Sequence, residues 1–160
     1  MLIMTGSLIG YAASNRLSER LSFIEQYIQF LNFTETQIRY SSCSLSQIMS
    51  GFMQDRKIGN MLRSCVDEMN NGKVLYEAWN NAVNGAAQEY GLKKEDEAVI
   101  KSFGDELGNS DVDGQIMNCR LNRELMTTRL NNAREERQKK SKLYVLLGVF
   151  GGTLFVLLFI

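Results

Sequence analysis

The last 18 residues, Leu143 to Ile160, form an uncharged and almost wholly apolar run, which constrains the fold more than any other feature. At about 1.5 Å of rise per residue, a helix of this length nearly matches the roughly 30 Å hydrocarbon thickness of a bilayer. A helix that is apolar on every side at a chain end is rarely part of a globular core. We therefore predict a C-terminal transmembrane helix over residues 143–160.

Two glycines in this run, Gly148 and Gly152, stand four residues apart. This spacing places both on one face of a membrane helix, where the missing side chains let a second helix approach closely. The pattern predicts a helix-packing face and, with it, a homo-oligomer. Because glycine is frequent in membrane helices generally, lipid contact at this face is the open alternative.

A basic segment directly precedes the apolar run and orients the predicted span. Only two acidic residues offset its five cations, which are Arg134, Arg137, Lys139, Lys140 and Lys142. Positive charge that flanks a membrane helix stays on the cytoplasmic side, and it attracts anionic lipid headgroups. We predict that this basic flank contacts the membrane surface, with a solvated helix face as the alternative. The preceding domain is then cytosolic.

Residues 1–15 are also uncharged, although their apolar part is short for a membrane span. One interpretation is a signal peptide. Against it, the segment lacks a basic start and a convincing cleavage site, and export would put the basic flank on the wrong side. The other interpretation is a second membrane anchor followed by Arg16 and Arg20 in the cytoplasm. We favour the anchor, and its shortness leads us to expect that the true start lies upstream.

The central segment, residues 16–142, has the pattern of packed amphipathic helices. The chain contains no proline, the commonest helix breaker. Apolar residues recur at spacings of three, four and seven, the seam of a helix that packs on one face. The first seam comprises Leu17, Leu21, Ile24, Ile28, Leu31 and Ile38. We predict an all-α fold, an antiparallel helical bundle of about six helices between membrane-anchoring N- and C-terminal helices.

Three local patterns refine this prediction. Ser44 and Gln47 have the spacing of a capping box, in which each side chain binds the other residue's backbone at a helix start. Trp79 is expected to anchor the core, because one indole buries a large area. The charged residues 93–97 are expected to form a solvated helix face, with docking as the alternative.

The segment Phe103–Gln115 predicts a tight structural corner between two helices. Gly108 suits the position just after a helix, where the backbone is left-handed. Ser110 or Asp111 can cap the next helix by accepting its free amide hydrogens. Gly104 is expected to let the two helices approach closely. No breaker follows before the apolar run, so one helix is expected to run from Asp111 into the bilayer.

Composition and motifs exclude several function classes. The 18 basic and 18 acidic residues balance, whereas a nucleic-acid binder needs surplus positive charge. Histidine is absent, which removes histidine triads and imidazole metal ligands. Residues 109–114 resemble a calcium loop, but Arg120 stands where that loop requires glutamate. We expect no catalytic, metal or cofactor site, and three buried, reduced thiols at helical positions: Cys43, Cys65 and Cys119.

Three segments together resemble the stage III sporulation protein AB family: FGDELGNSDVDGQ at Phe103–Gln115, Glu77-Ala78-Trp79, and the tail Lys142–Ile160. The match covers nearly the whole chain and includes RLSER at Arg16–Arg20. The N-terminus departs from the family, whose members have a fuller first membrane segment. The resemblance implies a two-anchor membrane protein. Its bundle would be similar to the cytoplasmic domains of type II secretion F-type and pilus platform proteins.

The resemblance also implies a location and partners. The family works in the mother-cell membrane around the forespore, within a secretion-like channel complex, and the bundle would face the mother-cell cytoplasm. The implied partners are the motor ATPase, stage III sporulation protein AA, and other channel components. Our functional hypothesis is a non-catalytic platform or adaptor that couples the motor ATPase to membrane components. The alternative is a self-assembling membrane scaffold without a motor partner.

Overall fold

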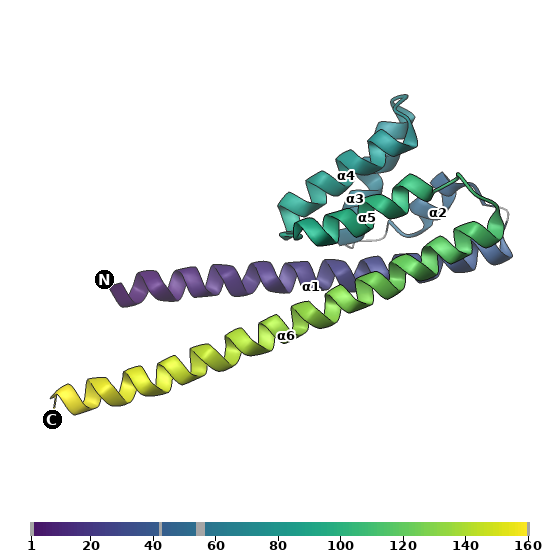
Figure 1. Cartoon of the computed structure of the whole chain (residues 1–160). Helices are drawn as coiled ribbons and strands as arrows, with labels where there is room; N and C mark the ends of the chain where they lie inside the picture. Colours follow the sequence, from purple (N-terminus) through teal and green to yellow (C-terminus); the bar gives the residue numbers. More distant parts are fainter. Residues whose placement is uncertain (1, 42, 54–56, 160) are drawn as a thin grey trace.

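The computed structural model describes the backbone of residues 2–41, 43–53 and 57–159, and side chains within 15–41, 43–53 and 57–139. The described residues form six helices: α1 (Leu2–Tyr40), α2 (Leu45–Gly51), α3 (Lys57–Asn70), α4 (Leu75–Tyr90), α5 (Lys94–Glu106) and α6 (Val112–Phe159). The helices α1 and α6 run antiparallel, and both chain ends lie at the same end of the molecule (Figure 1). The predicted all-α antiparallel bundle of about six helices is confirmed.

The four short helices gather along one part of the long α1–α6 pair, so that both terminal stretches project beyond them (Figure 1). Within the described residues, no helix carries a stretch long and apolar enough to cross a membrane. The segments predicted to lie in the membrane are helical in their described backbone, but the side chains of residues 1–14 and 140–160 lie outside the described set. Gly148, Gly152, Lys140 and Lys142 are among these residues.

The predicted seam of α1 supplies one side of the core. Ile24 and Leu31 of the seam are fully buried, and Ile28 and Ile38 are partly buried at the core margin. Three neighbouring aromatic residues of α1 are also fully buried: Phe23, Tyr27 and Phe30. A broad apolar stripe of this kind must pack against other elements, because each buried large side chain contributes about 1.5–3 kcal/mol. The seam therefore holds α1 against the short helices and α6.

Aromatic side chains from three helices meet at the centre. The ring centroids of Trp79 and Phe103 lie 5.7 Å apart, and that of Phe30 lies 6.4 Å from each. The Trp79 indole N–H donates a 2.8 Å hydrogen bond to the Ile100 carbonyl, so its polar atom is satisfied. Trp79 is fully buried, as predicted for a core anchor. The predicted Ser44–Gln47 capping box is also present at the start of α2.

Candidate functional site at the α1–α6 groove

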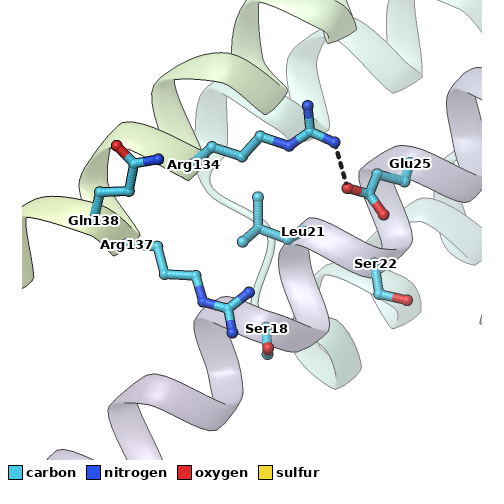
Figure 2. Close-up of a pocket in the computed structure, with 7 residues that line it drawn as sticks. All are labelled: Ser18, Leu21, Ser22, Glu25, Arg134, Arg137 and Gln138. Carbon is cyan, nitrogen blue, oxygen red and sulfur yellow. Dashed lines mark hydrogen bonds and ion pairs between the residues drawn. The ribbon is translucent and has the colours of Figure 1, made fainter. Parts of the chain in front are cut away.

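A polar groove of about 520 Å³ lies between α1 and α6 (Figure 2). On each helix the lining residues stand three or four positions apart, so they share the face that looks toward the other helix. The buried Leu21 lies among polar side chains, which are Ser18, Ser22, Glu25, Arg134, Arg137 and Gln138. The groove therefore offers hydroxyl, amide, carboxylate and guanidinium groups over an apolar base.

The two arginines of the groove differ in their ion pairing among the described residues. Arg134 Nη2 lies 2.7 Å from Glu25 Oε1, an ion pair that joins α6 to α1. Arg137 reaches toward Ser18 in Figure 2, and no ion pair between described residues includes it. Two guanidinium groups and one carboxylate leave the groove with one net positive charge. Its chemistry favours a small anion.

The groove divides the predicted basic flank. Arg134 and Arg137 line it, whereas Lys139 is exposed outside it and lies 3.8 Å from Glu135 Oε2. The side chains of Lys140 and Lys142 are outside the described residues. Sequence reasoning identified both arginines but had no means of finding Ser18, Ser22 or Glu25 opposite them, because no local pattern links segments more than a hundred residues apart.

A buried ion pair holds the bundle together close to this groove. Arg20 of α1 donates to both carboxylate oxygens of Asp96 of α5, from Nε at 2.6 Å and from Nη2 at 2.9 Å. Both side chains are nearly excluded from solvent, at 6% and 0% exposure. The bidentate geometry satisfies the carboxylate while fixing the angle between the helices. Asp96 was expected on a solvated helix face, and its burial shows that this prediction is wrong, whereas the cytoplasmic side expected for Arg20 stays a prediction.

The same ion pair extends to α6. Asp96 Oδ2 also accepts the Lys93 backbone N–H at 2.9 Å, at the start of α5. Glu136 of α6 lies 2.7 Å from Lys93 Nζ and 3.8 Å from Arg20 Nη1. Charges from α1, α5 and α6 thus converge at one level of the bundle, and on α6 Glu136 lies in the same helical turn as Arg134 and Arg137 of the groove.

A second charge cluster joins α1 to α6 nearer the corner. Glu35 accepts from Arg120 Nε at 2.9 Å, from Arg123 Nη1 at 2.8 Å and from Arg39 Nη2 at 3.0 Å. Partial burial acts to raise the pKa of Glu35, but the hydrogen bonds from the three arginines outweigh it and hold this pKa below its ordinary 4.5. Arg123, which interrupts the apolar heptad pattern of α6, is placed there as a partner for Glu35.

The corner before α6 has the local geometry of a helix end followed by a cap. Gly108 has a φ of +78°, a left-handed backbone that favours glycine. Asp111 Oδ1 accepts the Gly114 backbone N–H at 2.9 Å, so Asp111 is the residue that caps α6. Ser110 instead accepts a 2.7 Å hydrogen bond from the Gln115 side-chain amide.

Gly104 meets a different neighbour from the one expected. A Cβ atom built there would lie against the Trp79 ring of α4, closer than real Cβ contacts occur. Gly104 therefore makes room for the indole, whose atoms are the nearest to this position. The sequence contained the glycine but not the fold of α4 against α5, which only the assembled core determines.

The cysteines divide into two groups. Cys65 and Cys119 are buried, and burial, with smaller effects of nearby Glu68 and Glu35, raises the pKa of each thiol to about 12. Cys43 is exposed in the connection between α1 and α2, so the prediction of a buried helical thiol is wrong there. The apolar seam ends before α1 does, and Cys43 follows it in a short polar connection.

The outward face of α6 carries an apolar stripe at a spacing of four residues. Met117, Leu121 and Leu125 are exposed by 64%, 54% and 42%, and no described residue covers them. Large side chains at this spacing lie on one helix face.

In the part of the chain that the structure describes, no group of three or more Cys, Asp or Glu is arranged to hold a metal ion.

Comparison with curated proteins finds no match. A solved structure described as stage III sporulation protein AB (SpoIIIAB) resembles this chain with a TM-score of 0.66 at 21% sequence identity. The match covers 76% of this chain and 98% of the other. At that identity, the likeness shows a shared fold. The sequence model of stage III sporulation protein AB matches residues 1–160. The chain therefore belongs to the stage III sporulation protein AB family.

Proposed function

We propose that the protein is a non-catalytic platform or adaptor of the complex that joins mother cell and forespore during sporulation. Its role is to couple the motor ATPase, stage III sporulation protein AA, to membrane components of that complex. Membership of the stage III sporulation protein AB family supports the sporulation role. In this proposal, residues 1–15 and 143–160 are anchors in the mother-cell membrane, and residues 16–142 face the mother-cell cytoplasm.

The observation that carries the proposal is the continuity of α6. Its backbone is helical from Val112, at the corner of the bundle, to Phe159 in the apolar run. The 48 residues span about 72 Å at ~1.5 Å per residue. Sharp helix kinks need proline or another identifiable disruption, and the chain has no proline. A displacement of the bundle is therefore transmitted along α6 instead of being absorbed by a linker.

The ion pairs described above support transmission by fixing α6 to the bundle. Glu136 joins α6 to Lys93 of α5, while Glu35 of α1 binds Arg120 and Arg123 of α6. Such contacts tolerate little sliding, because their energy depends on donor and acceptor geometry. A partner that moves the short helices therefore moves α6 as well.

Co-purification with the ATPase tests the proposal. We expect tagged full-length chain, solubilised in mild detergent, to retain stage III sporulation protein AA, and a chain lacking residues 17–142 to lose it. The matched control is recovery of the truncated chain in the membrane fraction, which shows that it was made and inserted. Undiminished ATPase recovery with the truncated chain contradicts the proposal.

The exposed stripe on α6 favours a second function, a scaffold that assembles from copies of this chain. Two copies that pair through Met117, Leu121 and Leu125 bury apolar surface on both sides, as a two-fold interface does. Leu121→Glu is then expected to lower the oligomer size measured by light scattering. Tyr76→Glu, at a similarly exposed position on α4, is the control.

A separate experiment tests the predicted packing of membrane helices through the face that carries Gly148 and Gly152. Replacing Gly148 and Gly152 with isoleucine blocks close approach of two membrane helices. If the scaffold forms through this face, the double variant loses its oligomers while ATPase recovery is retained. If the oligomer size is unchanged by this variant and by Leu121→Glu, the scaffold function is contradicted.

A further inference from the structure

The α1–α6 groove has one guanidinium that the described fold does not use. Arg134 is paired with Glu25 and so contributes to packing, whereas Arg137 extends into the groove without an ion pair among the described residues (Figure 2). An arginine can donate several hydrogen bonds in one plane, a geometry that suits phosphate and carboxylate groups. Ser18 lies beside it as a hydroxyl donor.

The charge and size of the groove narrow the class of ligand. Its single net positive charge matches one negative charge, the charge of a phosphodiester. The volume of about 520 Å³ lies within the usual range for small-molecule sites. The buried Leu21 provides an apolar surface beside the charged groups. A small anion that carries an apolar part therefore fits the groove better than a fully hydrated ion does.

The position of the groove along the helices identifies the source of that anion. Ser18 follows the apolar part of residues 1–13 by five residues, and Arg137 precedes the run at Leu143 by six. At ~1.5 Å per residue, Ser18 is about 7.5 Å and Arg137 about 9 Å from an apolar segment. The headgroup layer extends roughly 5–8 Å beyond the hydrocarbon on each side of a bilayer. Ser18 thus lies at the outer edge of the headgroup layer, and the long side chain of Arg137 brings its guanidinium within reach of lipid phosphates.

We propose that the α1–α6 groove is a phospholipid site that binds the headgroup phosphate of an anionic lipid through Arg137 and Ser18. The inference rests on the membrane placement in the proposed function. Arg134, paired with Glu25 of α1, lines the groove beside Arg137 and joins the two helices there. A bound lipid bridges α1 and α6 where the two helices project from the bundle.

Lipid-dependent thermal stability of the full chain tests the site. The protein in neutral detergent receives phosphatidylglycerol, phosphatidylcholine or inorganic phosphate at matched ionic strength, and the unfolding midpoint is recorded. A ligand that binds the folded state raises this midpoint with concentration. We expect a saturating rise with phosphatidylglycerol that exceeds the rise with phosphatidylcholine. Arg137→Gln is expected to remove more than half of it.

Lys139→Gln is the matched control, because it removes the same charge two residues away at an exposed position outside the groove. It is expected to keep the full rise. An equal loss in both variants contradicts the site, since it indicates general attraction to a basic surface. A rise with inorganic phosphate but none with phosphatidylglycerol overturns the lipid source, and no rise with either overturns the site itself.

The ATPase experiment separates this inference from the proposed function. Arg137→Gln is expected to leave recovery of the ATPase unchanged, because the groove lies between α1 and α6 and its ligand is a lipid. If the full-length protein fails to retain the ATPase but its unfolding midpoint still rises with phosphatidylglycerol, only the coupling role is contradicted. Intact ATPase binding with no lipid effect contradicts the groove alone. As a second readout, native mass spectrometry of the same samples counts the lipids bound to each variant.

Discussion

The carboxylate of Asp96 sits where α1 meets the start of α5, fully removed from solvent and held by Arg20 through two hydrogen bonds. Its oxygens also receive the Lys93 backbone N–H. A buried pair of this kind contributes little beyond an apolar pair of the same shape, but breaking it leaves one charge without compensation. Single substitutions at this position should therefore be costly.

Asp96→Asn tests that expectation at the residue scale. We expect the free energy of unfolding to fall by about 3–5 kcal/mol, because the buried Arg20 guanidinium loses the carboxylate that accepts both of its short hydrogen bonds and keeps only Glu136, 3.8 Å from Nη1. Asp105→Asn makes the same change at an exposed position of α5 and should alter stability by less than about 0.5 kcal/mol. Urea unfolding in detergent, followed by circular dichroism, measures both. Equal small effects would show that Arg20 finds another partner.

Gly104 offers a second prediction, with its own control in the chain. Gly104→Ala forces the new methyl group against the Trp79 indole and should destabilise the fold by about 1–3 kcal/mol. Gly85→Ala meets no atom within 4 Å and lies inside α4, so it should stabilise by up to about 1 kcal/mol. Trp79 is the only tryptophan, and its fluorescence reports both transitions. A neutral Gly104→Ala would mean that the indole has room to move.

Sequence reasoning at this scale succeeded where the relevant partner is local. Ser44 and Gln47 are three residues apart, and Gly108 is determined by its own backbone. It failed where the partner is distant: Asp96 looks solvated within its charged run until Arg20, 76 residues away, is placed beside it. The exposed Cys43 was misread for a related reason, since no helix or packed surface extends over it.

At the scale of elements, the contact between α1 and α6 depends on pH through Glu35. Its folded pKa lies below 4.5, so ionised Glu35 contributes stability above that value and loses it as the pH falls through the lower folded pKa. We expect Glu35→Gln to be less stable than the parent protein at neutral pH. The difference should narrow at acid pH below 4.5.

Urea unfolding at a series of pH values measures this difference. Glu124→Gln, at an exposed position on α6 with no ion pair among the described residues, is the control and should show a constant difference. A gap between the parent protein and Glu35→Gln that stays constant across the range would contradict the assigned pKa shift.

Element boundaries and seams could largely be predicted, because apolar spacing determines which face of each helix is buried. The seam of α1, the helix after Ser44 and the uninterrupted α6 are all present in the fold. The register of α6 against α1 could not be predicted. It depends on side chains such as Glu35 and Arg123, which are 88 residues apart, and no local period specifies that pairing.

At the scale of the whole molecule, the proposed coupling depends on an unbroken α6. Lys139 lies in α6 between the bundle and the apolar run. Lys139→Pro removes one backbone hydrogen bond there, and its ring clashes with the backbone carbonyl four residues earlier, at a cost of about 3 kcal/mol or more. We expect ATPase recovery to be retained but spore formation to fall sharply, because motion no longer reaches the membrane segment. Spore counts in a strain that carries the variant measure the outcome.

Lys139→Ala is the matched control, since it removes the same exposed side chain without disturbing the helix. It should sporulate as the parent strain does. Normal spore counts with Lys139→Pro would contradict mechanical coupling through α6 even if the ATPase binds. Spore loss with both variants would instead assign the effect to the lysine charge.

The fold class followed from local helical periodicity and the absence of proline, and the family followed from short segments such as Phe103–Gln115. The groove did not, because it exists only when Ser18 and Arg137 are brought together by packing. Basic residues before an apolar run indicate a surface contact, but the shape of that contact belongs to the assembled pair of helices.

The antiparallel arrangement of α1 and α6 also determines how the molecule bears force. Both chain ends leave at the same end, while the short helices and the corner lie toward the other (Figure 1). A pull between the two chain ends and the corner stretches both helices in the same direction, so each carries part of the load. The interface between them is then not sheared, and the contacts of Glu35 and Arg134 are not dragged past one another. Tension along the molecule is thus shared by α1 and α6, which lie side by side. A twist about the long axis, in contrast, shears the interface between the two helices.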